Sequence, residues 1–267
     1  MRGITRDTFG EMIDRKGALV AVVSIAIGIW IVLSSNWEKL RIAFEQTDPK
    51  LPYAPVDEIS LHFLSTYATV LTGVVCLLAA GVIPAMLRSA TTWFYFARPI
   101  SRTRVLVEKL WAVVIVYLGL LLVMTLPVVV IASLRHYLFD IRVGEILLIH
   151  IFNCAVWLTL IVALGILLRS TIRVIAVSLA VYAAQLLLPH ATTLGEKLSI
   201  PFLGSVLNSI SFALPRMAEL GEAAQKIASG GTPALFTPVM MTLLSVGLTL
   251  YFAIAKLSRQ DLMAPND

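Results

Sequence analysis

Long apolar stretches alternate with shorter polar ones along the whole chain. An α-helix needs about 20 mostly apolar residues to cross a bilayer, and each stretch approaches or exceeds that length. The fifth stretch meets the requirement only marginally. Pro84 marks a kink in the second stretch, and Pro127 is predicted to interrupt the third. The pattern predicts six membrane-spanning helices, at about 17–33, 61–87, 105–134, 145–168, 174–188 and 238–257.

Composition supports this interpretation. Hydrophobic residues make up 58% of the 267 residues, and charged residues only 14%. A soluble chain of this length would carry far more charged surface. We therefore expect an all-α polytopic membrane protein, with residues 1–267 forming a single transmembrane domain. The net charge of +5 is explained by lipid headgroups and topology, so it does not indicate nucleic-acid binding.

The basic residues indicate the orientation of the bundle. Thirteen of the 21 lysines and arginines fall in the segments 1–17, 88–109, 169–173 and 256–267. Cytoplasmic loops carry the Lys/Arg excess in membrane proteins. Both termini are therefore expected on the cytoplasmic side, and 36–60 and 190–237 on the opposite side.

Three segments outside the spans are predicted to form further helices. Residues 1–16 are amphipathic, which favours a helix lying in the membrane interface over a plain cytoplasmic tail. Residues 201–214 are apolar but too short to span, which favours an interfacial or re-entrant helix. A more polar helix follows, with Met217, Leu220, Ala224 and Ile227 on one face, and it ends at Gly230-Gly231.

The segment 88–109 is the most basic part of the chain. In its middle, Trp93, Phe94, Phe96 and Ala97 share one face of a short helix. Pro99 ends that helix, because proline disfavours helical geometry in the residue before it. We expect a short helix with exposed aromatic side chains at the cytoplasmic surface.

This segment also carries a family resemblance. Ala97-Arg98-Pro99-Ile100-Ser101-Arg102, followed by Val105-Leu106-Val107-Glu108-Lys109-Leu110, resembles the central loop of ABC-2-type exporter permeases. In that family the helix before the motif is the coupling helix, which docks on a separate ATPase subunit. The resemblance further implies an N-terminal elbow helix before the first span and external re-entrant helices before the last. The implied coupling residues are Thr92, Trp93, Phe94, Tyr95, Phe96, Arg98 and Arg102.

Two predicted spans have unusual faces. Small and polar residues recur at helical spacing on the second span, and alanines recur every fourth residue on the fifth. Such faces are typical of close helix packing, and they are also compatible with a pathway lining. The family resemblance implies that these two spans line the translocation route and face the axis of a dimer. The candidate pathway or dimer residues are Ser65, Thr69, Thr72, Cys76, Ala176, Ala180, Ala184 and Gln185.

No motif in the sequence indicates covalent chemistry. The phosphate-binding pattern G-x-x-x-x-G-K-[ST] is absent, and no Cys/His spacing suits a metal. His150 and Asn153 share one face of the fourth span, where packing or an interhelical hydrogen bond is favoured over an intramembrane enzyme site. We expect no catalytic residue, no metal and no cofactor in this chain.

The resemblance implies the permease subunit of an ATP-driven exporter in a bacterial cytoplasmic (inner) membrane. ATP and Mg²⁺ would bind to a separate ATPase subunit, and a second permease copy would complete a homodimer. The alternative is a membrane component that transmits force to a periplasmic partner in assembly or maturation, without bulk transport. In that alternative, residues 36–60 and 190–237 would contact the partner. The substrate stays open.

Overall fold

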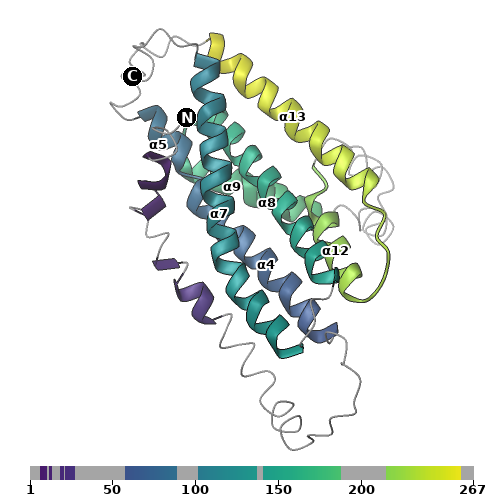
Figure 1. Ribbon diagram of the computed structural model, residues 1–267. Coiled ribbons are helices and arrows are strands. Elements are labelled where there is room, and N and C mark those ends of the chain that lie inside the picture. Colours follow the sequence, from purple (N-terminus) through teal and green to yellow (C-terminus); the bar gives the residue numbers. More distant parts are fainter. Residues whose placement is uncertain are drawn as a thin grey trace, which may run out of the picture.

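The computed structural model describes residues 7–10, 12–13, 19–20, 22–27, 58–88, 102–136, 141–187 and 215–259. The described elements are all helical (Figure 1). They are α4 (Glu58–Ala79), α5 (Val82–Arg88), α7 (Arg102–His136), α8 (Ile141–Leu168), α9 (Thr171–Leu187), α12 (Met217–Ala228) and α13 (Phe236–Arg259).

Four apolar helical stretches in the described part are long enough to cross a membrane. They are Leu61–Leu87, Arg104–Pro127, Ile141–Leu168 and Phe236–Leu257, and they match the predicted second, third, fourth and sixth spans. The predicted fifth span corresponds to α9, whose apolar part, Thr171–Gln185, is shorter. These findings confirm a helical, multi-pass membrane protein.

The second span is divided, as Pro84 predicted. Helix α4 ends at Ala79 and α5 begins at Val82, so the break lies just before the proline. Proline has no backbone N–H, so Pro84 cannot donate to the carbonyl of Ala80, four residues earlier. Helix α5 can therefore run in a different direction from α4.

The prediction for the third span was wrong in one respect. Helix α7 continues without a break from Arg102 to His136 and contains Pro127 in its interior. Transmembrane helices tolerate proline because neighbouring helices and local adjustment compensate for the lost hydrogen bond. In α7, the hydroxyl of Thr125 donates to the carbonyl of Leu121 at 2.9 Å, just before the proline.

Helix α8 lies at the centre of the bundle, in contact with α4, α5, α7, α9, α12 and α13 (Figure 1). Its side chains contribute to all three clusters of buried apolar residues. Buried positions occur on every side of the helix from Val156 to Ile166. This all-round burial is expected of a central helix in a membrane bundle.

The helix ends gather at two opposite ends of the bundle. At one end, Lys256 of α13 donates to the carbonyl of Leu167 of α8 at 2.9 Å, and Leu106 of α7 shares a core cluster with Leu257. The α5 helix lies at this same end (Figure 1). At the other end, α12 packs with Leu61 of α4 and Val143 of α8.

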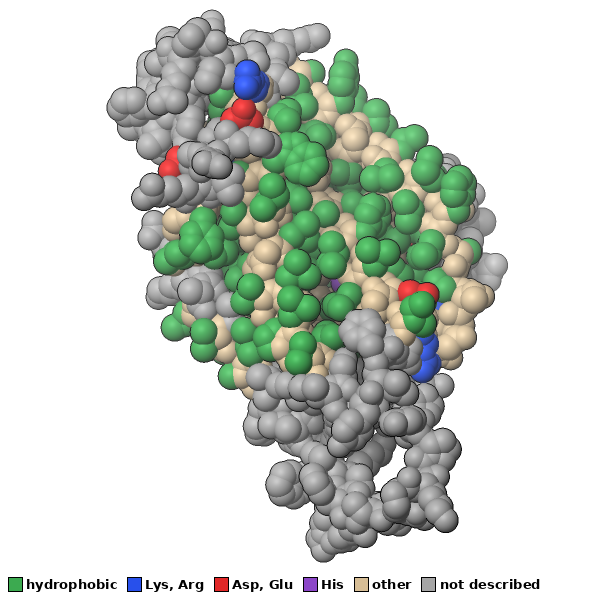
Figure 2. Space-filling model, viewed as in Figure 1, with side chains coloured by type: hydrophobic (Ala, Val, Ile, Leu, Met, Phe, Trp, Pro, Cys, Tyr) green, Lys and Arg blue, Asp and Glu red, His purple; other side chains and the backbone are tan. Residues whose placement is uncertain are grey.

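Hydrophobic side chains cover much of the visible face between these ends (Figure 2). Among the described residues, α13 exposes Leu244, Tyr251 and Phe252 by more than half of their surface. In a soluble protein such a surface would be unfavourable, but it suits contact with lipid.

The amino-terminal segments are described only in part, and they contact the core. Residues 22–27 are helical, and the hydroxyl of Tyr67 donates to the carbonyl of Ser24 at 2.7 Å. Residues 7–10 are helical too, and Met12 is buried while Phe9 is exposed. The predicted interfacial helix and first span otherwise lie outside the described residues, as do 36–57 and 201–214.

Gly165 sets the approach of α8 to α5. A Cβ atom built there would lie 2.8 Å from Cβ of Ile83 and 3.3 Å from Cδ of Pro84. Gly165→Ala should therefore force the two helices apart and destabilise the bundle by roughly 1–3 kcal/mol. The measurement is thermal unfolding of the purified protein in detergent.

Gly119→Ala is the matched control, because a Cβ at Gly119 in α7 would meet nothing within 4 Å. Alanine also favours a helix interior over glycine, so this variant should melt at or above the wild-type temperature. Equal melting of the Gly165→Ala variant and wild type would contradict the close approach.

Candidate functional site: an intramembrane cavity

A cavity of about 270 Å³ lies between α4, α8 and α9. Six of its lining residues carry polar groups, and they come from all three helices. They are Thr69, Thr72 and Cys76 of α4, Asn153 of α8, and Ser178 and Tyr182 of α9. Small residues on α4, such as Gly73 and Cys76, leave open space. Larger side chains such as Trp157 and Tyr182 border that space from α8 and α9.

The remaining wall is mostly apolar. Leu77 of α4, Trp157 of α8 and Leu179 of α9 are among the residues that line it. Trp157 and Tyr182 pair across α8 and α9, with ring centroids 6.2 Å apart. Val70, Leu77 and Leu179 are each about half exposed, so the cavity opens to the apolar surface of the bundle.

Two oxygens of cavity-lining residues are buried without a hydrogen-bond partner in the described part of the chain. They are Oδ1 of Asn153 and Oγ of Ser178. The Asn153 side chain is only 6% exposed. An unsatisfied buried acceptor costs about 1–3 kcal/mol. Both oxygens have almost no accessible surface, so neither borders the open space of the cavity.

Next to the cavity, α4 and α8 are joined by a buried polar pair. The hydroxyl of Ser65 and Nε2 of His150 lie 3.3 Å apart, and both residues are almost fully buried. His150 lies one helical turn before Asn153, on the same side of α8. The pairing agrees with the predicted interhelical hydrogen bond for His150.

The structure brings together most of the polar face predicted on the second span. Thr69, Thr72 and Cys76 line the cavity, whereas Ser65 pairs with His150 beyond its end. The hydroxyls of Thr69 and Thr72 donate to α4 carbonyls at 2.9 and 2.8 Å, so their methyl groups are free to form apolar wall.

The alanine stripe on α9 does not line the cavity. Ala176 and Ala180 are exposed, and Ala184 is half-buried. The cavity face of α9 instead carries Ser178 and Tyr182. A stripe of exposed small residues beside an apolar opening suits the approach of another helix, and its role as a dimer face stays a prediction.

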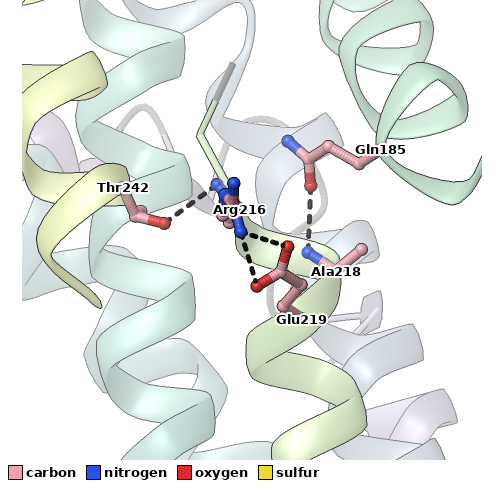
Figure 3. Close-up of polar contacts among 5 residues, drawn as sticks. All are labelled: Gln185, Arg216, Ala218, Glu219 and Thr242. Atoms are coloured by element: carbon pink, nitrogen blue, oxygen red, sulfur yellow. Dashed lines mark hydrogen bonds and ion pairs between the residues drawn. The ribbon is translucent and has the colours of Figure 1, made fainter. Parts of the chain in front are cut away.

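Gln185 is not at the cavity either. Its Oε1 accepts a hydrogen bond of 3.0 Å from the backbone N–H of Ala218, in the first turn of α12 (Figure 3). Close by, Oγ1 of Thr242 in α13 accepts from the N–H of Arg216 at 3.0 Å (Figure 3). Two membrane helices thus supply acceptors to one end of α12.

The sequence at the start of α12 explains these contacts. The N-cap position holds Arg216, whose side chain has no acceptor to offer the free N–H groups of the first turn. Its guanidinium instead pairs with the carboxylate of Glu219 at 3.1 Å. Gln185 and Thr242 therefore accept hydrogen bonds from the start of α12, in place of a Ser or Asp side chain at the N-cap position.

The predicted coupling residues are not placed by the structure. Thr92, Trp93, Phe94, Tyr95, Phe96 and Arg98 lie outside the described residues. Arg102 is described only as the first residue of α7. Their docking role stays a prediction.

Sequence reasoning missed the contribution of α8 to the cavity. Asn153, Trp157 and Ile161 recur every four residues and form its α8 wall. The signal was present in Asn153, because an amide inside a 28-residue apolar helix marks a buried or functional face. The sequence pattern favours packing or an interhelical hydrogen bond for that amide.

The cavity is lined without any charged residue. Within the described residues there is also no group of three His, Cys, Asp or Glu side chains that could hold a metal. No protein-family model, curated protein or solved structure matches the chain.

The caps on α12 generate a prediction. Gln185→Leu and Thr242→Val each remove one acceptor, and losing a helix cap costs about 0.5–2 kcal/mol. Each variant should speed hydrogen–deuterium exchange in the first turn of α12, measured by mass spectrometry. Thr249→Val is the control, because that hydroxyl donates within α13 to Ser245. Unchanged exchange in the first two variants would show that α12 is held by other contacts.

Proposed function

We propose that the chain is the permease subunit of an ATP-binding-cassette exporter. It would act as a homodimer in a bacterial cytoplasmic membrane and bind a separate ATPase subunit. ATP and Mg²⁺ would be held by that partner, and this chain would contribute the pathway but no covalent chemistry. The force-transmitting alternative requires no internal cavity, and the cavity between α4, α8 and α9 therefore favours transport.

The observation that carries the proposal is the position of the two helices that flank residues 89–101. Helix α5 leads into this segment, and α7 leads out of it, at the end of the bundle where α8 joins α9. The described basic residues Arg104, Lys109, Arg169, Arg173 and Lys256 therefore belong to this end, whereas Arg142, Arg216 and Lys226 belong to the other. This excess of basic residues agrees with a cytoplasmic face.

The packing of α5 supports a coupling role. Val82, Ile83 and Met86 are buried, and Ile83 lies against Gly165 of α8. Because the break at 80–81 separates α5 from α4, a push on residues 89–101 would pass to α8 through this contact. Ile161 of α8, one turn before Gly165, lines the cavity. Motion at the docking segment would thus reach the cavity wall.

The proposed homodimer would use the apolar surface beside the cavity opening. Ala176 and Ala180 are exposed there on α9. Small residues let helix backbones approach closely, which is the main source of helix association within lipid.

The proposal predicts the effect of removing an aromatic side chain at the docking segment. Trp93→Ala or Phe94→Ala should weaken binding of the ATPase by about 2 kcal/mol, which is roughly thirtyfold, because buried aromatics anchor interfaces. Insertion and folding should be unchanged. The measurement is recovery of an ATPase carrying G-x-x-x-x-G-K-[ST] with the tagged permease, together with its coupled hydrolysis.

Trp111→Ala is the matched control. Trp111 lies in α7, where 53% of it is exposed on the apolar surface of the bundle, so the variant should retain the ATPase. Equal recovery of the ATPase with all three variants would contradict the coupling role. Solute movement by the complex in vesicles separates transport from the force-transmitting alternative.

A further inference from the structure

We infer that the cavity between α4, α8 and α9 binds an uncharged, lipid-like molecule with a hydrocarbon chain. The inference rests on the proposed function only in treating this molecule as the exporter's substrate. Binding itself is a property of this chain alone, and it can be measured without an ATPase.

The absence of charge around the cavity restricts the ligand class. The polar lining consists of hydroxyl, thiol and amide groups, with no Lys, Arg, Asp or Glu among the lining residues. An ionised group placed there would be desolvated without a counter-ion, which is strongly unfavourable. Nucleotides, sugar phosphates and free carboxylates are poor candidates for this reason.

The size of the cavity restricts the ligand further. An engineered cavity of about 150 Å³ holds a benzene molecule, whereas pockets for drug-sized ligands begin at about 300 Å³. A cavity of 270 Å³ lies just below that range. It would hold a linear chain of roughly ten carbon atoms, and it is too small for an oligosaccharide or a folded peptide.

The opening indicates how such a molecule would enter. Val70 and Leu77 of α4 and Leu179 of α9 are each about half exposed at the cavity. They place the opening on the apolar surface that suits contact with lipid. A molecule already dissolved in the bilayer could therefore enter sideways, with its chain in apolar surroundings throughout.

The test uses the full-length chain in lipid nanodiscs and a decanol that carries a photoreactive diazirine on its chain. Mass spectrometry should locate its adducts on α4, α8 and α9. Three analogues with the same chain compete with it: decanol, decane and decanoate. Decanol and decane should each compete at least tenfold better than decanoate. Equal competition by decanoate would overturn the exclusion of charge, and failure of decane to compete would overturn the uncharged hydrocarbon as the ligand class.

Gly73→Leu should reduce labelling at least fivefold. Gly73 lines the cavity, and a Cβ there would meet nothing within 4 Å, so the larger side chain fills open space without a clash. Gly119→Leu is the matched control in α7, where space is also open but the residue does not line this cavity. Equal labelling of the two variants would place the probe elsewhere and overturn the inference.

Thermal unfolding separates loss of the site from loss of folding. Gly73→Leu should unfold at a temperature close to that of Gly119→Leu, because a Cβ at either position meets nothing within 4 Å. If binding holds and the ATPase experiment fails, the site stands and the exporter proposal does not.

Discussion

The structure depends on the packing of α8, which is surrounded by six other helices. Within lipid, apolar side chains gain little from leaving their surroundings, so contact between helices must come from close fit and hydrogen bonds. Gly165 provides the close fit at one end, where Ile83 and Pro84 fill the space of a missing side chain. Ser65 and His150 provide a buried hydrogen bond in the other half of the same helix. These contacts position α8 against α4 and α5, and α4 and α8 supply two of the cavity walls.

Buried polar groups divide into two classes in this bundle. One class joins helices: Ser65 with His150, Gln185 with Ala218, and Thr242 with Arg216. The other class has buried oxygens without a partner in the described part of the chain, at Asn153 and Ser178. A polar atom in lipid is costly unless it is paired, so the first class explains how the fold is held. The second class lowers the stability of the helices that border the cavity.

Much of the fold could be predicted from the sequence because hydrophobic runs and proline have local effects. The four long spans, the break near Pro84 and the α12 helix with its end at Gly230 all followed from short patterns. Gly230 indeed adopts a positive φ of 76° just after α12. Continuity of α7 through Pro127 could not be predicted, because tertiary packing decides whether a proline breaks a helix.

The site was harder to predict, because it depends on rotation of helices about their axes. Sequence spacing found the polar face of α4. On α9 it named the alanine stripe as a pathway or dimer face, and Ser178 rather than Ala180 lies at the cavity, while the dimer role stays a prediction. Gln185 was named as a pathway or dimer residue, and in the structure it contacts α12. Its partner, the N–H of Ala218, is 33 residues away in the chain, and no local pattern indicates such a contact.

The connection between α8 and α9 is unusually tight. Only Arg169 and Ser170 separate the two helices, and Arg169 has a positive φ of 52°, unusual for a residue other than glycine. Further along, α9 packs against α8 through Trp157 and Tyr182, and Gln185 joins it to α12. The backbone conformation of one residue therefore sets where α9 starts relative to α8, and with it the position of the cavity wall that α9 supplies.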